Sequence, residues 1–314
     1  LTAIQNGACR HVTFVPIYIG YDRVPEVGAY LQEAEGGKKE PESFWQMLRA
    51  RRVLKKRFGK IYIKFCEPIA LKDLENEYGA PVPDMRAKDI RALTRDLGDR
   101  VLRAIDRHTV VTPQALVSAA VLNSAHKVIS REQIDFNMDT FMRHMEAMNV
   151  SHAETLMMDQ RHAATHILNG FVQSKFLRPV SKEDAQSREG HYHLTIGKRP
   201  ALDYYKNSGI GPFVPAAMTS LAILARDAFQ FASTDLYDHY RFLQTLFQNE
   251  FAAGNGAAMN TRIRKTIKAF MADAILVPHP KLPDTYNLTS EGFRKLKCFA
   301  GFMAPFLESY WIVL

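Results

Sequence analysis

Cysteine is scarce in this chain, and its three members, Cys9, Cys66 and Cys298, lie far apart in apolar surroundings. Structural zinc sites and disulfide-stapled domains need cysteines at short, regular spacings. The sequence therefore predicts neither a cysteine metal site nor a disulfide framework. It favours a reducing compartment, where thiols stay free.

Long hydrophobic runs are also rare. A membrane-spanning helix needs about 20 mostly apolar residues. The most apolar stretch, 209–225, is shorter and contains two prolines, while the longer stretch 295–314 carries charged side chains. We expect 209–225 to form a buried core helix, with contact to lipid or an acyl chain as the alternative. The sequence thus predicts peripheral contact with a membrane in place of a spanning helix.

Histidine is more plentiful, with eleven residues, but no pattern among them completes a metal site. His162 and His166 have the i, i+4 spacing of a helical metal pair. No glutamate directly follows His162 and no third ligand is evident, so we interpret the pair as structural. His191 and His193 alternate along a predicted strand and receive the same interpretation. We predict no metal and no cofactor.

Basic residues outnumber acidic ones, which gives a net charge of +8 and a pI of about 9.3. Such a chain suits anionic partners: nucleic acid, acidic lipid headgroups or phosphorylated substrates. The densest cluster of cations comprises Arg49, Arg51, Arg52, Lys55, Lys56 and Arg57. Each basic residue near an anionic bilayer is worth about 1 kcal/mol. We predict contact with phosphate or an anionic membrane surface, with an ordinary solvated helix face as the alternative.

The organising stretch of the chain is 11–24, HVTFVPIYIGYDRV. Its nearly continuous β-branched and aromatic run is typical of a strand buried on both faces in a parallel sheet. Pro16 removes a ladder donor, which predicts a bulge, an edge or a point where the strand leaves the sheet. Ligands collect beyond the carboxyl ends of such strands. We therefore expect 16–22 to form a wall of a binding site, with an ordinary core strand as the alternative.

Helix and strand signals alternate before the composition changes. Ser43 is placed to cap a helix over 44–58, and 60–65 alternates like a strand at a sheet edge. This order predicts the end of an α/β domain. The polar stretch 72–83, with its Gly and Pro residues, marks the boundary. The expected divisions are an α/β unit over 1–75, a helical connector over 76–110 and a mainly helical domain over 111–314.

Helical signals dominate the region after this boundary. An amphipathic pattern predicts a helix over 87–107, and Pro113 opens a second helix over 114–126. Ser130 is placed to cap a third helix, with Gln133 completing a capping box.

An internal repeat lies in the helical region. Segments 141–195 and 240–289 each contain two helices, an apolar strand, a turn and a second short strand. This order outlines a winged helix, so we predict two winged-helix-like units. The helix around 162–172 would be the nucleic-acid reader, yet it lacks a dense stripe of Arg and Lys. We favour packing against a catalytic domain or a membrane, and we predict no nucleic-acid partner.

Several motifs, in chain order, resemble the glycerol-3-phosphate acyltransferase family in its bacterial membrane-associated form. Residues 13–24 are similar to the family's fourth and last sequence block, an apolar strand with an internal proline followed by Ser/Gly-Tyr-Asp/Glu. Further matches are FWQMLR at 44–49, GKIYIKFCEPI at 59–69, SREQI at 130–134 and DYYKN at 203–207. The family's His-x-x-x-x-Asp block, its arginine-bearing block and its Glu-Gly-x-Arg-Ser block are not in this chain, and the resemblance implies that they lie upstream of it.

The resemblance implies a reaction, its partners and a location. A fatty acyl group passes from acyl-CoA or acyl carrier protein, the co-substrate, to the first hydroxyl of sn-glycerol 3-phosphate in phospholipid biosynthesis. A histidine held by an aspartate takes the proton from that hydroxyl, which attacks the thioester. The family works at the cell membrane, here expected as peripheral binding to the cytoplasmic face. We expect this chain to be a piece of a longer protein and to be inactive alone, with no catalytic residue of its own.

The candidate substrate-binding residues are Val15, Pro16, Ile17, Tyr18 and Tyr21. The resemblance implies that their strand forms a wall of the acyltransferase site. Two other functions remain open at this point: the related dihydroxyacetone phosphate acyltransferase, and a non-catalytic winged-helix binding module.

His279 and Asp284 match His-x-x-x-x-Asp letter for letter. Two prolines between them predict an extended loop, whereas the family's motif needs both side chains to converge at the start of a helix. The match also follows the fourth block where the family's motif precedes it. We therefore reject this pair as catalytic.

Overall fold

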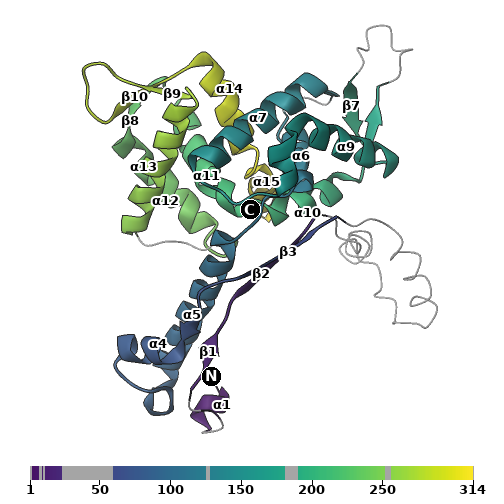
Figure 1. Cartoon of the computed structure of the whole chain (residues 1–314). Coiled ribbons are helices and arrows are strands. Elements are labelled where there is room, and N and C mark those ends of the chain that lie inside the picture. The colour runs from purple at the N-terminus through teal and green to yellow at the C-terminus, as the bar shows by residue number, and fades with distance from the viewer. Residues whose placement is uncertain are drawn as a thin grey trace, which may run out of the picture.

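The computed structural model describes residues 2–6, 9, 11–22, 59–124, 128–180, 190–251 and 256–313. Figure 1 shows a mainly helical body joined to an elongated arm, in which one long helix runs beside thin two-stranded ribbons. The N-terminus lies at the far end of the arm, and the C-terminus lies at the body. The predicted helix over 44–58 and its basic cluster fall outside the described residues.

The described elements comprise helices, short 3₁₀ turns and strands. The helices are α1 (Thr2–Gln5), α4 (Leu71–Tyr78), α5 (Ala87–Arg107), α6 (Pro113–Leu122), α7 (Arg131–Ala147), α8 (Glu154–Met158), α9 (Gln160–Gln173), α10 (Arg199–Ser208), α11 (Val214–Leu224), α12 (Tyr237–Leu246), α13 (Gly256–Ala272), α14 (Ser290–Ala300) and α15 (Ala304–Val313). The 3₁₀ turns are η1 (Val82–Asp84), η2 (Gly211–Phe213) and η3 (Ser233–Leu236). The strands are β1 (Thr13–Phe14), β2 (Ile17–Tyr21), β3 (Ile61–Phe65), β4 (Ile69–Ala70), β5 (Val128–Ser130), β6 (Leu177–Pro179), β7 (His191–Leu194), β8 (Gln230–Ala232), β9 (Leu276–Pro278) and β10 (Thr285–Leu288).

The strands of the arm form two antiparallel ribbons, β1 with β4 and β2 with β3. Val15 and Pro16 separate β1 from β2, so the proline stands where the chain leaves one ribbon and enters the next. This confirms one of the three outcomes expected for Pro16. The expectation of a parallel sheet is wrong for the described residues, because β2 pairs antiparallel with β3 and exposes every second side chain.

The outer end of the arm has a small core of its own. Ile4 of α1 packs with Leu71 and Leu74 of α4, and with Val82 and Leu93. The polar stretch 72–83, which we predicted as a domain boundary, contains most of α4 and the start of η1 and is partly buried. Gly79 takes φ 75° and ends α4 in the left-handed conformation that glycine adopts readily. The division of the chain into domains stays a prediction.

The body contains the same arrangement twice, as the internal repeat predicted. Strand order β5-β7-β6 in one small sheet matches β8-β10-β9 in the other, with every pair antiparallel. In each unit a helix precedes the first strand, helices separate the first strand from the hairpin, and a further helix follows. In Figure 1 the first unit lies around α6, α9 and β7, and the second around α12, α13 and β10.

The two units also share the turn that starts each hairpin. Lys175 and Ala274 have φ values of 58° and 51°, each two residues before the first hairpin strand. A backbone amide closes the turn in each unit, from Phe176 to the carbonyl of Phe171 at 2.8 Å and from Ile275 to that of Phe270 at 2.9 Å. The two units therefore agree in backbone conformation as well as in the order of their elements. A chance similarity in element order would not require the same backbone conformation.

One large hydrophobic core joins both units. Phe141, Phe213, Phe299 and Phe302 are buried in contact with one another, with Phe213 and Phe302 stacked at 4.7 Å between ring centroids. Helix α11 is buried along most of its length, so the stretch 209–225 contributes to this core as expected. Within the described residues, no helix is long and apolar enough to cross a membrane.

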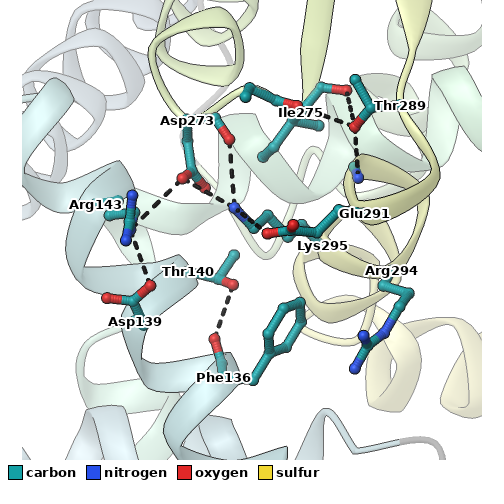
Figure 2. A network of polar contacts seen from close by, with 12 residues as sticks. Phe136, Asp139, Thr140, Arg143, Asp273, Ile275, Thr289, Glu291, Arg294 and Lys295 are labelled. Atoms are coloured by element: carbon teal, nitrogen blue, oxygen red, sulfur yellow. Dashed lines mark hydrogen bonds and ion pairs between the residues drawn. The ribbon is translucent and has the colours of Figure 1, made fainter.

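A buried ion pair bridges α14 and the turn after α13 (Figure 2). Lys295 Nζ lies 2.9 Å from Asp273 Oδ1, and both residues are less than a tenth exposed. Arg143 of α7 reaches the same carboxylate at 3.7 Å and Asp139 at 2.8 Å. Glu291 lies 3.0 Å from Lys295. The network thus links the first unit to the second through charged side chains.

Local capping follows the sequence in part. Ser130 Oγ accepts from the backbone N–H of Gln133, so the predicted cap of α7 is confirmed. The Gln133 amide donates to Asn137 Oδ1 at 2.8 Å, so it does not complete a capping box. Helix α6 begins at Pro113 as expected but ends at Leu122, short of the predicted end.

Candidate functional site

The two faces of strand β2 have opposite environments. Ile17, Ile19 and Tyr21 are 39%, 52% and 42% exposed, while Tyr18 and Gly20 are buried. The sequence expectation of burial on both faces is therefore wrong for the described residues. The apolar run marks a strand with one face packed on the protein and one apolar face open.

Strand β3 continues the open face. Its register places Phe65 opposite Ile17, Ile63 opposite Ile19 and Ile61 opposite Tyr21. The three β3 side chains are 56–71% exposed. We call the six residues Ile17, Ile19, Tyr21, Ile61, Ile63 and Phe65 the apolar ladder. Contiguous exposed apolar patches mark interaction surfaces, because scattered single residues are what ordinary surfaces show.

The opposite face of the ribbon is fastened to the body. Tyr18 Oη donates to the carbonyl of Val110 at 3.3 Å, and burial raises the pKa of this phenol. Lys64 Nζ donates to Ser151 Oγ at 2.9 Å. A Cβ added at Gly20 would lie 2.3 Å from Tyr18 Oη, so glycine leaves room for the ring. These contacts set the orientation in which the apolar ladder points outward.

The candidate site residues divide between the two faces. Val15, Ile17 and Tyr21 are exposed, whereas Pro16 and Tyr18 are buried. The Pro16 carbonyl accepts from Cys66 N–H at 2.9 Å, which ties the turn between the ribbons to the end of β3. The five residues therefore do not line one pocket, and their role in binding substrate stays a prediction.

Asp22 closes the ribbon at the carboxyl end of β2. Its Oδ2 accepts from Lys60 N–H at 2.8 Å, and its own N–H donates to the Lys60 carbonyl at 3.0 Å. Gly59 has φ 81°, and a Cβ there would lie 2.6 Å from that of Asp22. The neighbouring Tyr62 phenol has a raised pKa, first through burial and then through the charge of Asp22.

A cavity of about 820 Å³ opens beyond this end of β2. Asp22 forms one side, Gln114 at the start of α6 forms another, and α9 supplies a third. Asp22 and Gln114 are more than nine-tenths buried. Gln114 Oε1 has no hydrogen-bond partner within the described part of the chain. The cavity therefore contains one buried acceptor without a donor, Gln114 Oε1, and a buried carboxylate, Asp22, whose nearby donor is the Tyr62 hydroxyl.

Helix α9 lines the cavity with His162, His166, Asn169 and Gln173. Spacings of four, three and four residues put these side chains on one helical face. The sequence contained this signal, but we interpreted its histidines as a structural pair and its helix as a weak nucleic-acid reader. Gln114 carried no signal, because its place beside α9 depends on packing between elements distant in the chain.

Other candidate chemistry does not assemble. His279 Nδ1 accepts from the backbone N–H groups of Lys281 and Leu282, whereas Asp284 contacts Ser233 and Tyr286. The two side chains thus serve separate turn contacts, which agrees with their rejection as a catalytic pair. The described residues include no cluster of three or more side chains suited to a metal ion.

The helical body and the ribbons of the arm together make this a mixed α/β protein with many helices and small antiparallel sheets. Its sequence matches the family model for the glycerol-3-phosphate acyltransferase C-terminal region over residues 30–314. The chain belongs to this family.

Curated relatives agree with the family match. Glycerol-3-phosphate acyltransferases of Shewanella loihica and Glaesserella parasuis are 23% and 26% identical across the whole of this chain, which covers 38% of each. The enzyme of Shewanella pealeana is 34% identical over 45% of this chain and 18% of its own length. The chain thus spans less than two-fifths of the first two relatives.

Proposed function

We propose that this chain is the C-terminal region of a glycerol-3-phosphate 1-O-acyltransferase of the bacterial membrane-associated type. The observation that carries the proposal is the family match over 30–314, which covers nearly all of the chain. The substrates are sn-glycerol 3-phosphate and a long-chain acyl thioester of coenzyme A or acyl carrier protein. The related reaction on dihydroxyacetone phosphate is the competing outcome of the tests below.

Catalytic residues of this reaction lie outside the chain. A histidine held by an aspartate takes the proton of the substrate hydroxyl, which attacks the thioester carbon and releases the thiol. The Pro16 strand contributes a wall, with Val15, Pro16, Ile17, Tyr18 and Tyr21 as its contact region. The exposed apolar ladder supports this assignment, because it offers a face on which the catalytic part of the longer protein packs. Residues 1–75 complete the α/β domain in this arrangement.

The repeated units of the body are winged helices in outline. The strand order β5-β7-β6 and β8-β10-β9, with helices between the first strand and the hairpin, supports this. Nucleic acid is not their partner. Helix α9, the reader in a winged helix, turns the polar face of His162, His166 and Asn169 toward the cavity at the end of β2.

Peripheral contact with the cytoplasmic face of the cell membrane completes the proposal. The product is a lipid, and the chain carries a net charge of +8 that suits anionic headgroups. Trp311 and Ile312 of α15 are 83% and 82% exposed, and such side chains favour a membrane interface. The basic cluster at 49–57 adds charge, though it lies outside the described residues.

Replacement of Pro16 in the full-length protein tests the site wall. Pro16→Ala frees φ and adds an N–H at the break between the two ribbons, which shifts β2 relative to the remaining site. A misplacement of about 1 Å costs roughly 100-fold in rate. We expect such a loss in kcat/KM for acyl transfer to glycerol 3-phosphate, with an unchanged melting temperature.

The control is Pro280→Ala, which alters an exposed loop between β9 and β10. It should leave the rate as it is.

Purified 1–314 should show no acyl transfer. Wild-type kinetics for Pro16→Ala would reduce the strand to structural core. Turnover on dihydroxyacetone phosphate but not on glycerol 3-phosphate would favour the competing reaction.

A further inference from the structure

The cavity beyond β2 is built to accept hydrogen bonds. Gln114 Oε1 is a buried acceptor without a partner in the described chain. The buried Asp22 carboxylate, which the Tyr62 hydroxyl approaches, keeps capacity for a further donor. Leaving such a group unsatisfied costs about 1–3 kcal/mol, and a ligand N–H or O–H recovers part of that cost. Asn169 and Gln173 add amide groups on the α9 side. The complementary ligand therefore carries several donors along its length.

The described part of the lining offers no cation to a phosphate. Among the described lining residues there is no Lys or Arg, the side chains that hold phosphate groups. The carboxylate of Asp22 would repel an anion. The volume of about 820 Å³ lies within the range of about 300–1,000 Å³ typical of small-molecule sites. An uncharged, extended molecule with amides or hydroxyls fits these limits.

The acyl donor of the proposed reaction contains an uncharged, extended part of this kind. In both acyl-CoA and acyl carrier protein, the thioester lies at the end of a pantetheine arm. This arm is a neutral chain with two amides and one free hydroxyl, and phosphate is attached at its far end. We propose that the cavity between α6, α9 and the end of β2 binds the pantetheine arm of the acyl donor. This inference rests on the proposed function, since that function supplies the thioester.

Position supports the same ligand. The cavity begins at Asp22, directly after the strand that forms the proposed wall, so an arm held there directs its thioester along β2. Asp22 is far in sequence from Gln114 and from α9. Only the fold brings them together around the cavity. The body would thus recognise the acyl donor, while the catalytic residues lie outside the chain.

Kinetics of the full-length enzyme test the inference. Gln114→Leu removes one buried acceptor, and Asn169→Leu removes an amide from the exposed face of α9. We expect each to raise KM for palmitoyl-CoA and palmitoyl acyl carrier protein about 10-fold, with KM for glycerol 3-phosphate unchanged. Gln230→Leu, on the exposed edge strand β8, is the matched control and should change neither constant.

A truncated donor identifies the recognised part. The palmitoyl thioester of N-acetylcysteamine keeps the thioester and one amide but lacks the rest of the arm. With this donor the Leu variants and the wild type should have equal KM. An unchanged KM for palmitoyl-CoA in both variants, or a rise for glycerol 3-phosphate in its place, would overturn the inference.

Direct binding separates this inference from the proposed function. Free pantetheine should protect backbone amides of α9 from hydrogen exchange in the wild type and protect them less in Gln114→Leu. If the full-length protein transfers no acyl group from any donor, the proposed function fails, yet this protection would still identify a pantetheine site. Activity without any protection of α9 would place the arm elsewhere.

Discussion

The arm and the body differ in how far their apolar side chains are buried. In the body, aromatic side chains such as Phe141 and Phe299 are fully buried against each other. In the arm, the apolar ladder of β2 and β3 is open, with Phe65 71% exposed. A two-stranded ribbon is marginal by itself and needs a further layer on its apolar face. The difference indicates that the body is self-sufficient, whereas the ribbon is one layer of a larger structure.

Breaking the buried Lys295–Asp273 pair, which anchors the network that links the repeated units, tests the self-sufficiency of the body most severely. Lys295→Met leaves the buried Asp273 carboxylate without its closest partner, which should lower the free energy of unfolding by about 3–5 kcal/mol. The double variant Lys295→Met/Asp273→Leu should regain most of this loss, because an apolar pair carries no desolvation penalty. Urea denaturation of both variants measures the difference.

Arg241→Met is the control, because its ion pair with Asp238 is exposed at both partners. Exposed pairs contribute about 0–1 kcal/mol, so this variant should be near wild type. A loss in Lys295→Met no larger than in Arg241→Met would mean that the network of Figure 2 does not join the two units.

Acid sensitivity gives the next largest effect. Burial among Phe213, Phe270 and Phe299 lowers the pKa of His144 to about 4, from an ordinary value of 6.5. Between these values the unfolded chain binds a proton that the folded chain does not. The unfolding free energy should therefore fall as pH drops from 6.5 to about 4, by roughly 3 kcal/mol from this residue alone.

His144→Phe should remove this part of the pH dependence. The measurement is urea unfolding at pH 7 and pH 4.5 for the wild type and the variant. His162→Gln, which changes an exposed histidine on α9, should keep the wild-type slope. If His144→Phe loses as much stability on acidification as the wild type, then His144 is not neutral in the folded core.

How far the sequence predicts this fold depends on whether local signals decide it. Helix α5 has the predicted bounds, 87–107, because its amphipathic pattern and flanking residues act within a few turns. The repeat was visible in the sequence for the same reason, because both units have the same order of helices, turn and short strands, and nearby residues decide each of these. The Lys295–Asp273 pair was not predictable, because its partners meet across 22 residues only after the hairpin folds.

The candidate site shows a second limit. The composition of 13–22 predicted a strand and its proline break, but the apolar run gave no sign of which face is covered. A continuous apolar sequence favours burial on both faces. This expectation is wrong in the described residues because β3 pairs with the edge of β2 and the body covers one face of the ribbon alone. Gln114 went unnoticed because an isolated polar residue at a helix start is common. Its missing partner is visible only in three dimensions.

The most direct test of the account asks whether the apolar ladder is covered in the full-length protein. Ile63→Cys places a thiol on the ladder, and Ile196→Cys places one at a position that is 99% exposed on the body. Both are made after replacement of the accessible native cysteines, Cys9 among them. Maleimide labelling is then followed in the full-length protein and in purified 1–314. The account predicts that the thiol at position 63 reacts much more slowly than that at position 196 in the full-length protein, and at a similar rate in 1–314. Equal rates at both positions in the full-length protein would contradict the claim that the ribbon is one layer of a larger structure.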